Sequence, residues 1–280
     1  MLSKVVVSGN TLISFDERDV AQDFIRLDST KVGMIALATV EKVLPDLKSC
    51  ILNIPTLNTK GFISINQLEE EYFVTRHSLA KPVCQQDQFY VQIIQDKKGS
   101  KPCGCRFVRE PGRSSVTDYY LNLADADGCE LITDDRQAAS DFSQARFYED
   151  TFPLQDLYGF KQIAAQIANP IAHLKSGANI IIEPTEALCV IDINSASSKQ
   201  DALSINMEAT TEILRLIRLK NISGIIVIDY LKMDKEKQRT LLNFFQEKAA
   251  SDYSDVTAHG FTRLGLMEVT RSKIYGPNYS

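Results

Sequence analysis

The chain has 280 residues, of which 44% are hydrophobic and 24% are charged, and its formal net charge is −5. This composition is typical of a globular protein with one or two domains, and no apolar run approaches the roughly 20 residues of a membrane span. The N-terminus lacks the apolar core of a signal peptide, so we expect a cytoplasmic protein with no membrane partner. The net charge disfavours coating of nucleic acid by bulk attraction but allows a local basic groove.

The first thirty residues predict a hairpin, Lys4–Val7 and Leu12–Phe15, followed by an edge strand. Gly9-Asn10 is the turn signal between the two strands. From Val32 onward, short β-branched runs alternate with turn-forming clusters, with a short helical stretch near Gln67–Tyr72. These runs begin at Gly33, Cys50 and Lys60, and a further strand covers Phe89–Gln95. About five strands in seventy residues predict a small closed barrel.

Six scattered cysteines are expected to be free thiols in a reducing compartment. Cys103-Gly-Cys105 is the one close pair, and Cys84 and His77 could complete a zinc site only at poor spacing. We therefore expect two strand cysteines around a tight turn and no zinc, and the sequence leaves the role of the pair open.

The second half of the chain changes to alternating strands and helices. Lys97–Gln137 is turn-rich and holds one predicted strand, Asp118–Leu123, before a helical segment, Leu154–Leu174, that Pro170 interrupts. The predicted strands are Asn179–Glu183, Leu188–Ile193 and Ile225–Tyr230, and the predicted helices are Ala202–Lys220 and Lys235–Ala250.

Two of these strands share the tripeptide Val-Ile-Asp, at Asp192 and Asp229, and each ends within a few residues of its aspartate. The intervening helix makes a β-α-β unit, in which the strands are parallel and ligands bind at their carboxyl ends. A lone aspartate there would usually cap a loop, but two adjacent carboxylates are costly unless they share a proton or a cation. Magnesium is such a cation, and Asn194, on the same face as Asp192, is a candidate orienting residue.

Five stretches follow one another in the second half of the chain: Ser176–Ser195, Asn206–Ala209, Leu214–Asn221, Gly224–Tyr230 and Gly260–Arg271. In this order they resemble the catalytic core of the ribonuclease E/G family. The resemblance implies a DNase I-like catalytic subdomain in which Asp192 and Asp229 bind Mg²⁺, with Mn²⁺ a possible substitute. Asn194 matches the supporting asparagine of the family.

The resemblance also implies an α+β protein with several subdomains, in which a barrel interrupts a scaffold. Residues 1–30 would form the first piece of an RNase H-like scaffold, and 101–185 a reduced linker region and the second piece, which matches at Phe147–Ile182. Residues 31–100 would form an S1 (OB-fold) RNA-binding barrel. Residues 186–280 would form the catalytic subdomain. Two family features are missing: no Arg-Thr pair for a 5′-end sensor precedes Phe147, and the Cys-Pro-x-Cys zinc link is absent. We therefore expect a monomer or a dimer without a zinc link.

RNA-contact candidates fall in two regions. In the barrel, Phe62 matches a base-stacking position, and Lys60, Lys98 and Lys101 could meet phosphate. A core phenylalanine and solvated lysines are the alternatives. In the catalytic part the RNA-contact candidates are Arg215, Arg218, Arg263 and Arg271. Glu183 and Glu186 lie near the two aspartate strands, where they would either surround the metal ligands or serve only as hairpin residues. Arg215 and Arg218 also suit a helix C-terminus, where positive charge complements the macrodipole.

These observations predict a magnesium-dependent endoribonuclease that hydrolyses single-stranded RNA to 5′-phosphate and 3′-hydroxyl ends. One alternative is an S1-type RNA-binding protein that cleaves weakly or not at all. Another is a magnesium phosphoesterase acting on DNA or on a small phosphate ester. No Ser-His-Asp or Cys-His arrangement and no glycine-rich phosphate loop stands in the sequence.

Overall fold

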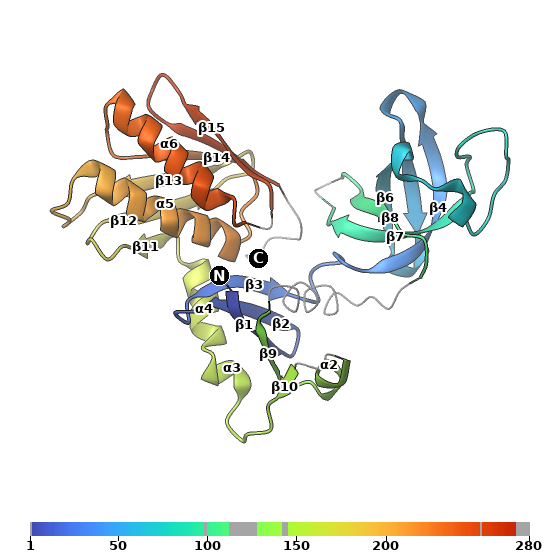
Figure 1. Ribbon diagram of the computed structural model, residues 1–280, viewed down its shortest axis with the longest axis horizontal. Coiled ribbons are helices and arrows are strands. Elements are labelled where there is room, and N and C mark those ends of the chain that lie inside the picture. The colour runs from blue at the N-terminus through green and yellow to red at the C-terminus, as the bar shows by residue number, and fades with distance from the viewer. Residues whose placement is uncertain (1, 98–99, 112–127, 142–144, 253, 273–280) are drawn as a thin grey trace. The chain divides into compact units, whose positions relative to one another are not determined.

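The computed structural model describes residues 2–97, 100–111, 128–141, 145–252 and 254–272 (Figure 1). The described chain is a mixed α+β protein with a five-stranded sheet, a closed five-stranded barrel and a six-stranded sheet. Lys98 and the predicted strand Asp118–Leu123 lie outside the described residues. No helix in the described part of the chain is long and apolar enough to cross a membrane.

The five-stranded sheet has the order β10-β9-β1-β2-β3. Its strands are β1 (Leu2–Ser8), β2 (Thr11–Asp16), β3 (Ala21–Arg26), β9 (Glu130–Thr133) and β10 (Ala145–Phe147), with a short helix α2 (Arg136–Asp141) between the last two. The predicted hairpin and edge strand are confirmed. Strand β9 pairs in parallel with both β1 and β10, so two distant pieces of chain build this sheet. The RNase H-like topology stays a prediction.

The barrel closes in the order β4-β5-β6-β8-β7, which confirms the predicted closed barrel. Its strands are β4 (Ile35–Leu44), β5 (Ser49–Ile54), β6 (Thr59–Ser64), β7 (Gln88–Gln95) and β8 (Cys103–Phe107). Alternate side chains of all five strands fill the interior. The predicted helical stretch is two 3₁₀ turns, η3 (Ile65–Gln67) and η4 (Glu70–Tyr72), and similar turns, η1 (Pro45–Leu47) and η2 (Pro55–Leu57), join β4 to β5 and β5 to β6.

The last barrel strand corrects two predictions. The predicted barrel range, 31–100, omits β8, because the Gly and Cys residues there were interpreted as a turn. Cys103 and Cys105 instead lie on one strand, and both side chains are buried in the barrel. Gly61 on β6 makes room for this packing, since a Cβ there would lie 2.5 Å from Cys105 Sγ.

The predicted helix Leu154–Leu174 is broken into two helices and a strand. Helix α3 (Leu154–Leu157) ends before Gly159, whose φ of 64° is left-handed, and α4 (Phe160–Ala168) is followed by β11 (Ile171–His173). The end of α4 is capped by Lys220, whose Nζ donates to Ile167 O at 2.5 Å and Asn169 O at 2.7 Å. Burial lowers the pKa of the Lys220 ammonium.

The six-stranded sheet has the order β11-β12-β13-β14-β16-β15. Besides β11 its strands are β12 (Asn179–Pro184), β13 (Cys189–Asn194), β14 (Gly224–Asp229), β15 (Val256–Phe261) and β16 (Met267–Arg271). Helices α5 (Ala202–Leu219) and α6 (Lys235–Ala249) lie side by side on one face (Figure 1), and the largest core lies between them and the sheet. The predicted boundary at 185/186 cuts this sheet, because β12 pairs antiparallel with β13.

Candidate metal centre and its surroundings

The two aspartates lie beside each other at the carboxyl ends of neighbouring parallel strands. Asp192 of β13 is the direct register partner of Asp229, the last residue of β14. Ile191, Ile193 and Ile228 alternate with them and are buried in the helix-covered core. Asp192 and Asp229 therefore point to the opposite face, where Asp229 is exposed and Asp192 half-buried. The predicted parallel β-α-β unit is confirmed.

Two asparagines flank this carboxylate pair. Asn194 Nδ2 donates a hydrogen bond of 2.9 Å to Asp192 Oδ2, so the amide orients that carboxylate. On the adjacent strand β12, Asn179 is the register partner of Asn194. Asn179 Oδ1 is buried and accepts no hydrogen bond from any described residue. The neighbourhood thus holds two carboxylates, one orienting amide and one amide oxygen without a partner in the described chain.

This donor set fits a hard divalent cation. Magnesium takes oxygen ligands, commonly one or two carboxylates, and keeps several waters, which the exposure of Asp229 permits. Among the described residues, no group of three or more His, Cys, Asp or Glu side chains is arranged to hold a metal. Two carboxylates in register are therefore the candidate ligands.

Two glutamates lie on the turn side of this sheet. Glu183 is the register partner of Val190, two residues before Asp192, and is exposed on the same face as the aspartates. Glu186 is exposed on the turn that joins β12 to β13. Glu183 can contribute negative potential near the aspartates, whereas the structure gives Glu186 only a turn position.

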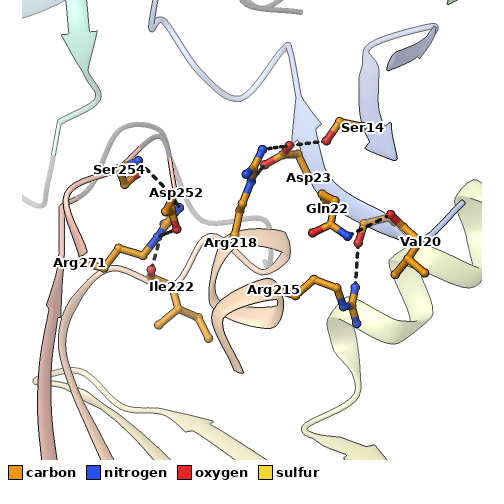
Figure 2. Close-up of polar contacts among 11 residues, drawn as sticks. Ser14, Val20, Gln22, Asp23, Arg215, Arg218, Ile222, Asp252, Ser254 and Arg271 are labelled. Carbon is orange, nitrogen blue, oxygen red and sulfur yellow. Dashed lines mark hydrogen bonds and ion pairs between the residues drawn. The ribbon is translucent and has the colours of Figure 1, made fainter. Parts of the chain in front are cut away.

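Arg215 and Arg218 bind protein groups of the β2–β3 segment (Figure 2). Arg218 Nε and Nη2 each donate to Asp23, at 2.6 Å, and Asp23 also accepts a hydrogen bond from Ser14. Arg215 Nη1 donates to Ala21 O at 2.8 Å, and its other nitrogens pair with Glu212 on the same helix. These contacts explain both arginines as structural residues, and their predicted RNA contacts stay untested.

Arg271 lies in the interior, contrary to its prediction as an RNA-contact residue. Its side chain has no exposed surface, and it pairs with Asp252 through Nε at 2.9 Å and Nη2 at 3.1 Å (Figure 2). Its Nη1 donates to Ile222 O at 3.2 Å. A fully buried guanidinium offers nothing for RNA to touch, so Arg271 holds the end of β16 to the fold. Arg263, on the turn between β15 and β16, is exposed.

The barrel candidates are on its surface. Phe62 on β6 is 36% exposed, so it is not the core phenylalanine that was the alternative. Lys60, on the same strand, pairs with Glu41 at 2.7 Å through a largely exposed contact, and Lys101 is exposed. Phe62 is therefore available for a base to stack on, and Lys60 would have to exchange a carboxylate for phosphate.

Two polar residues on the buried face of α5 were missed from the sequence. Asn206 and Thr210 are fully buried one helical turn apart and bond to Leu231 and Tyr230, directly after Asp229. The available signal was their spacing, because polar residues four apart interrupt an otherwise apolar helical face.

Comparison with known proteins matches the stretch that contains this site. The model of the ribonuclease E/G family matches residues 104–274. Ribonuclease E of Synechocystis sp. is 38% identical over an alignment of 356 residues, covering 88% of this chain and 52% of that protein. Ribonuclease E of Nostoc sp. is 37% identical over 194 residues, covering 67% and 27%, and ribonuclease G of Escherichia coli K12 is 33% identical over 138 residues, covering 47% and 28%. The chain spans about half the length of these relatives, or less. On this evidence the chain belongs to the ribonuclease E/G family.

Proposed function

We propose that this protein is a magnesium-dependent endoribonuclease that hydrolyses single-stranded RNA. The observation that carries the proposal is the register of Asp192 and Asp229, which brings two carboxylates together at the carboxyl ends of parallel strands. The matched relatives are named ribonucleases E and G, and the matched stretch includes both aspartates.

In this proposal each polar residue of the site has a distinct task. Asp192 and Asp229 hold the cation, and the hydrogen bond from Asn194 fixes the plane of the Asp192 carboxylate. When bound, magnesium supplies Lewis-acid stabilisation at the phosphate and favours deprotonation of the attacking water. Water adds across the P–O3′ bond: its oxygen stays on phosphorus as a 5′-phosphate, and a proton passes to the leaving 3′ oxygen.

The barrel supports single-stranded RNA as the substrate class. A stacking platform such as exposed Phe62 accepts any unpaired base, whereas a base pair inside a duplex hides its faces. A phosphoesterase for small esters would have no use for such a platform. The S1-type identity of the barrel and a cytoplasmic location belong to the same proposal.

The test is a time course on a fluorescent A/U-rich oligoribonucleotide with magnesium, with EDTA, and with the Asp192→Asn and Asp229→Asn variants. We expect internal cuts that need magnesium and are lost in both variants, with 5′-phosphate ends identified by mass spectrometry. Asp255→Asn is the matched control, because it removes the same charge just before β15, at the opposite end of the sheet.

One alternative has an observation in its favour. The closed barrel with an exposed phenylalanine would also suit a protein that binds RNA and does not cut it. Full binding without cleavage, unchanged in Asp229→Asn, would establish that alternative. Cleavage of DNA or of a small phosphate ester in preference to RNA would instead redirect the proposal to another substrate class.

A further inference from the structure

The buried face of α5 carries two polar residues that packing alone does not explain. Asn206 and Thr210 have no exposed surface, and both are poor helix formers. A buried amide or hydroxyl is costly unless it is hydrogen-bonded. The hydrogen-bond partners of Asn206 and Thr210 therefore indicate the role of these two residues.

Asn206 pairs with the chain just beyond Asp229. Its Oδ1 accepts from Leu231 N–H at 3.1 Å, and its Nδ2 donates to Leu231 O at 2.9 Å and reaches Met233 Sδ at 3.3 Å. Strand β14 has ended two residues before Leu231, so no strand satisfies these backbone groups. The side-chain amide replaces the missing strand partner.

Thr210 holds Tyr230, the residue between Asp229 and Leu231. Its hydroxyl donates to Asn206 O at 2.8 Å, so the 2.6 Å contact with Tyr230 is a hydrogen bond that the phenol donates. Tyr230 is buried in the core, and its ring lies 6.3 Å from that of Phe261. Both residues that follow Asp229 are thus attached to α5.

The two aspartates are held in different ways. Asp192 has a side-chain partner, Asn194, whereas the carboxylate of Asp229 accepts no hydrogen bond from the described residues. The position of Asp229 therefore depends on its backbone. We propose that Asn206 and Thr210 are positioning residues, which keep the end of β14 in place so that the Asp229 carboxylate stays next to Asp192. This proposal rests on the proposed function, because it assigns them to the metal site.

The test measures Mn²⁺ binding to the RNA-free chain by electron paramagnetic resonance, which requires no cleavage. Mutation of a group that orients a metal ligand typically weakens metal binding 10- to 100-fold. We expect Asn206→Leu and Thr210→Val to weaken Mn²⁺ binding about tenfold or more, and Thr210→Ser, which keeps the hydroxyl, to bind like the parent. Ile213→Val is the matched control: it removes a buried methylene group from the same face of α5 and touches neither Tyr230 nor Leu231 by hydrogen bonds.

The outcomes separate this proposal from the proposed function. If Asp229→Asn binds Mn²⁺ as tightly as the parent, the metal site itself is wrong and both proposals fall. If Asp229→Asn loses binding while Thr210→Val keeps it, or if Ile213→Val weakens it equally, only the positioning role is overturned. Should Asn206→Leu fail to fold, the Thr210→Val and Thr210→Ser pair decides alone.

Discussion

Removing Arg218 should destabilise the fold strongly, because the buried carboxylate of Asp23 would lose its ion-pair partner. Asp23 is 4% exposed, and both of its oxygens accept from Arg218 at 2.6 Å. Arg218→Met leaves the carboxylate buried, with the hydrogen bond from Ser14 that Figure 2 also shows. Breaking one half of a buried pair costs about 3–5 kcal/mol, roughly two to four orders of magnitude in the folding equilibrium.

Urea unfolding followed by tyrosine fluorescence measures this cost, because the chain has no tryptophan. The double variant Arg218→Met/Asp23→Leu should recover most of the loss, since apolar replacement of a buried pair is often neutral. Arg26→Met is the control: its pair with Asp28 is 3.4 Å long and half-exposed, so we expect about 0–1 kcal/mol.

A loss in Arg218→Met no larger than in Arg26→Met, or a double variant no more stable than the single one, would refute this reasoning. The double variant also tests the predicted RNA contact of Arg218. Normal RNA binding by the refolded double variant assigns Arg218 to the fold, whereas weak binding assigns it to RNA.

Three further predictions concern the surface and the barrel. Phe62→Ala should weaken binding of a single-stranded oligoribonucleotide by about 1–3 kcal/mol in fluorescence anisotropy without lowering the melting temperature; an unchanged Kd would place base stacking elsewhere. Arg263→Gln should reduce the slope of log Kobs against log[salt] by about 0.7, whereas Arg271→Met should lower the melting temperature and leave the slope unchanged. Gly61→Ala should cost about 1–3 kcal/mol by crowding Cys105 Sγ, and adding Cys105→Ala should restore stability; an uncrowded barrel would show neither effect.

The six-stranded sheet was predictable because its signal is local. Asp192 and Asp229 each follow an apolar run near the end of a strand. A single amphipathic helix, α5, connects the two strands, and such a crossover places them parallel to each other. Strand alternation then put Asn194 on the face of Asp192, where it bonds the carboxylate. Each of these inferences used residues within about forty positions of one another.

The arginines show where local patterns fail. Arg218 pairs with Asp23, 195 positions away in the sequence, and Arg271, at the end of β16, pairs with Asp252, which precedes β15. No sequence pattern identifies either aspartate as the partner. A guanidinium on a helix face or strand end looks the same whether it meets phosphate or carboxylate. The prediction for Cys103 and Cys105 was wrong for a different reason. Glycine is common in turns, so Gly104 was interpreted as a turn residue, whereas it lies inside the strand that closes the barrel.

The sheet alone does not hold Asp229. The pairing of β14 with β13 ends at the Asp192–Asp229 pair. The pairing of β14 with β16 ends one residue earlier, at Ile228. Beyond that point the chain is attached to the buried side of α5, and another side of the same helix is attached to β3 through Arg218. A change that loosens α5 should therefore disturb Asp229 before Asp192, because Asp192 keeps its pairing with Ile181 of β12 and its hydrogen bond from Asn194. On this reasoning Arg218, one of the arginines predicted from sequence to touch RNA, supports the site from a distance, by fixing the helix that fixes one of its two carboxylates.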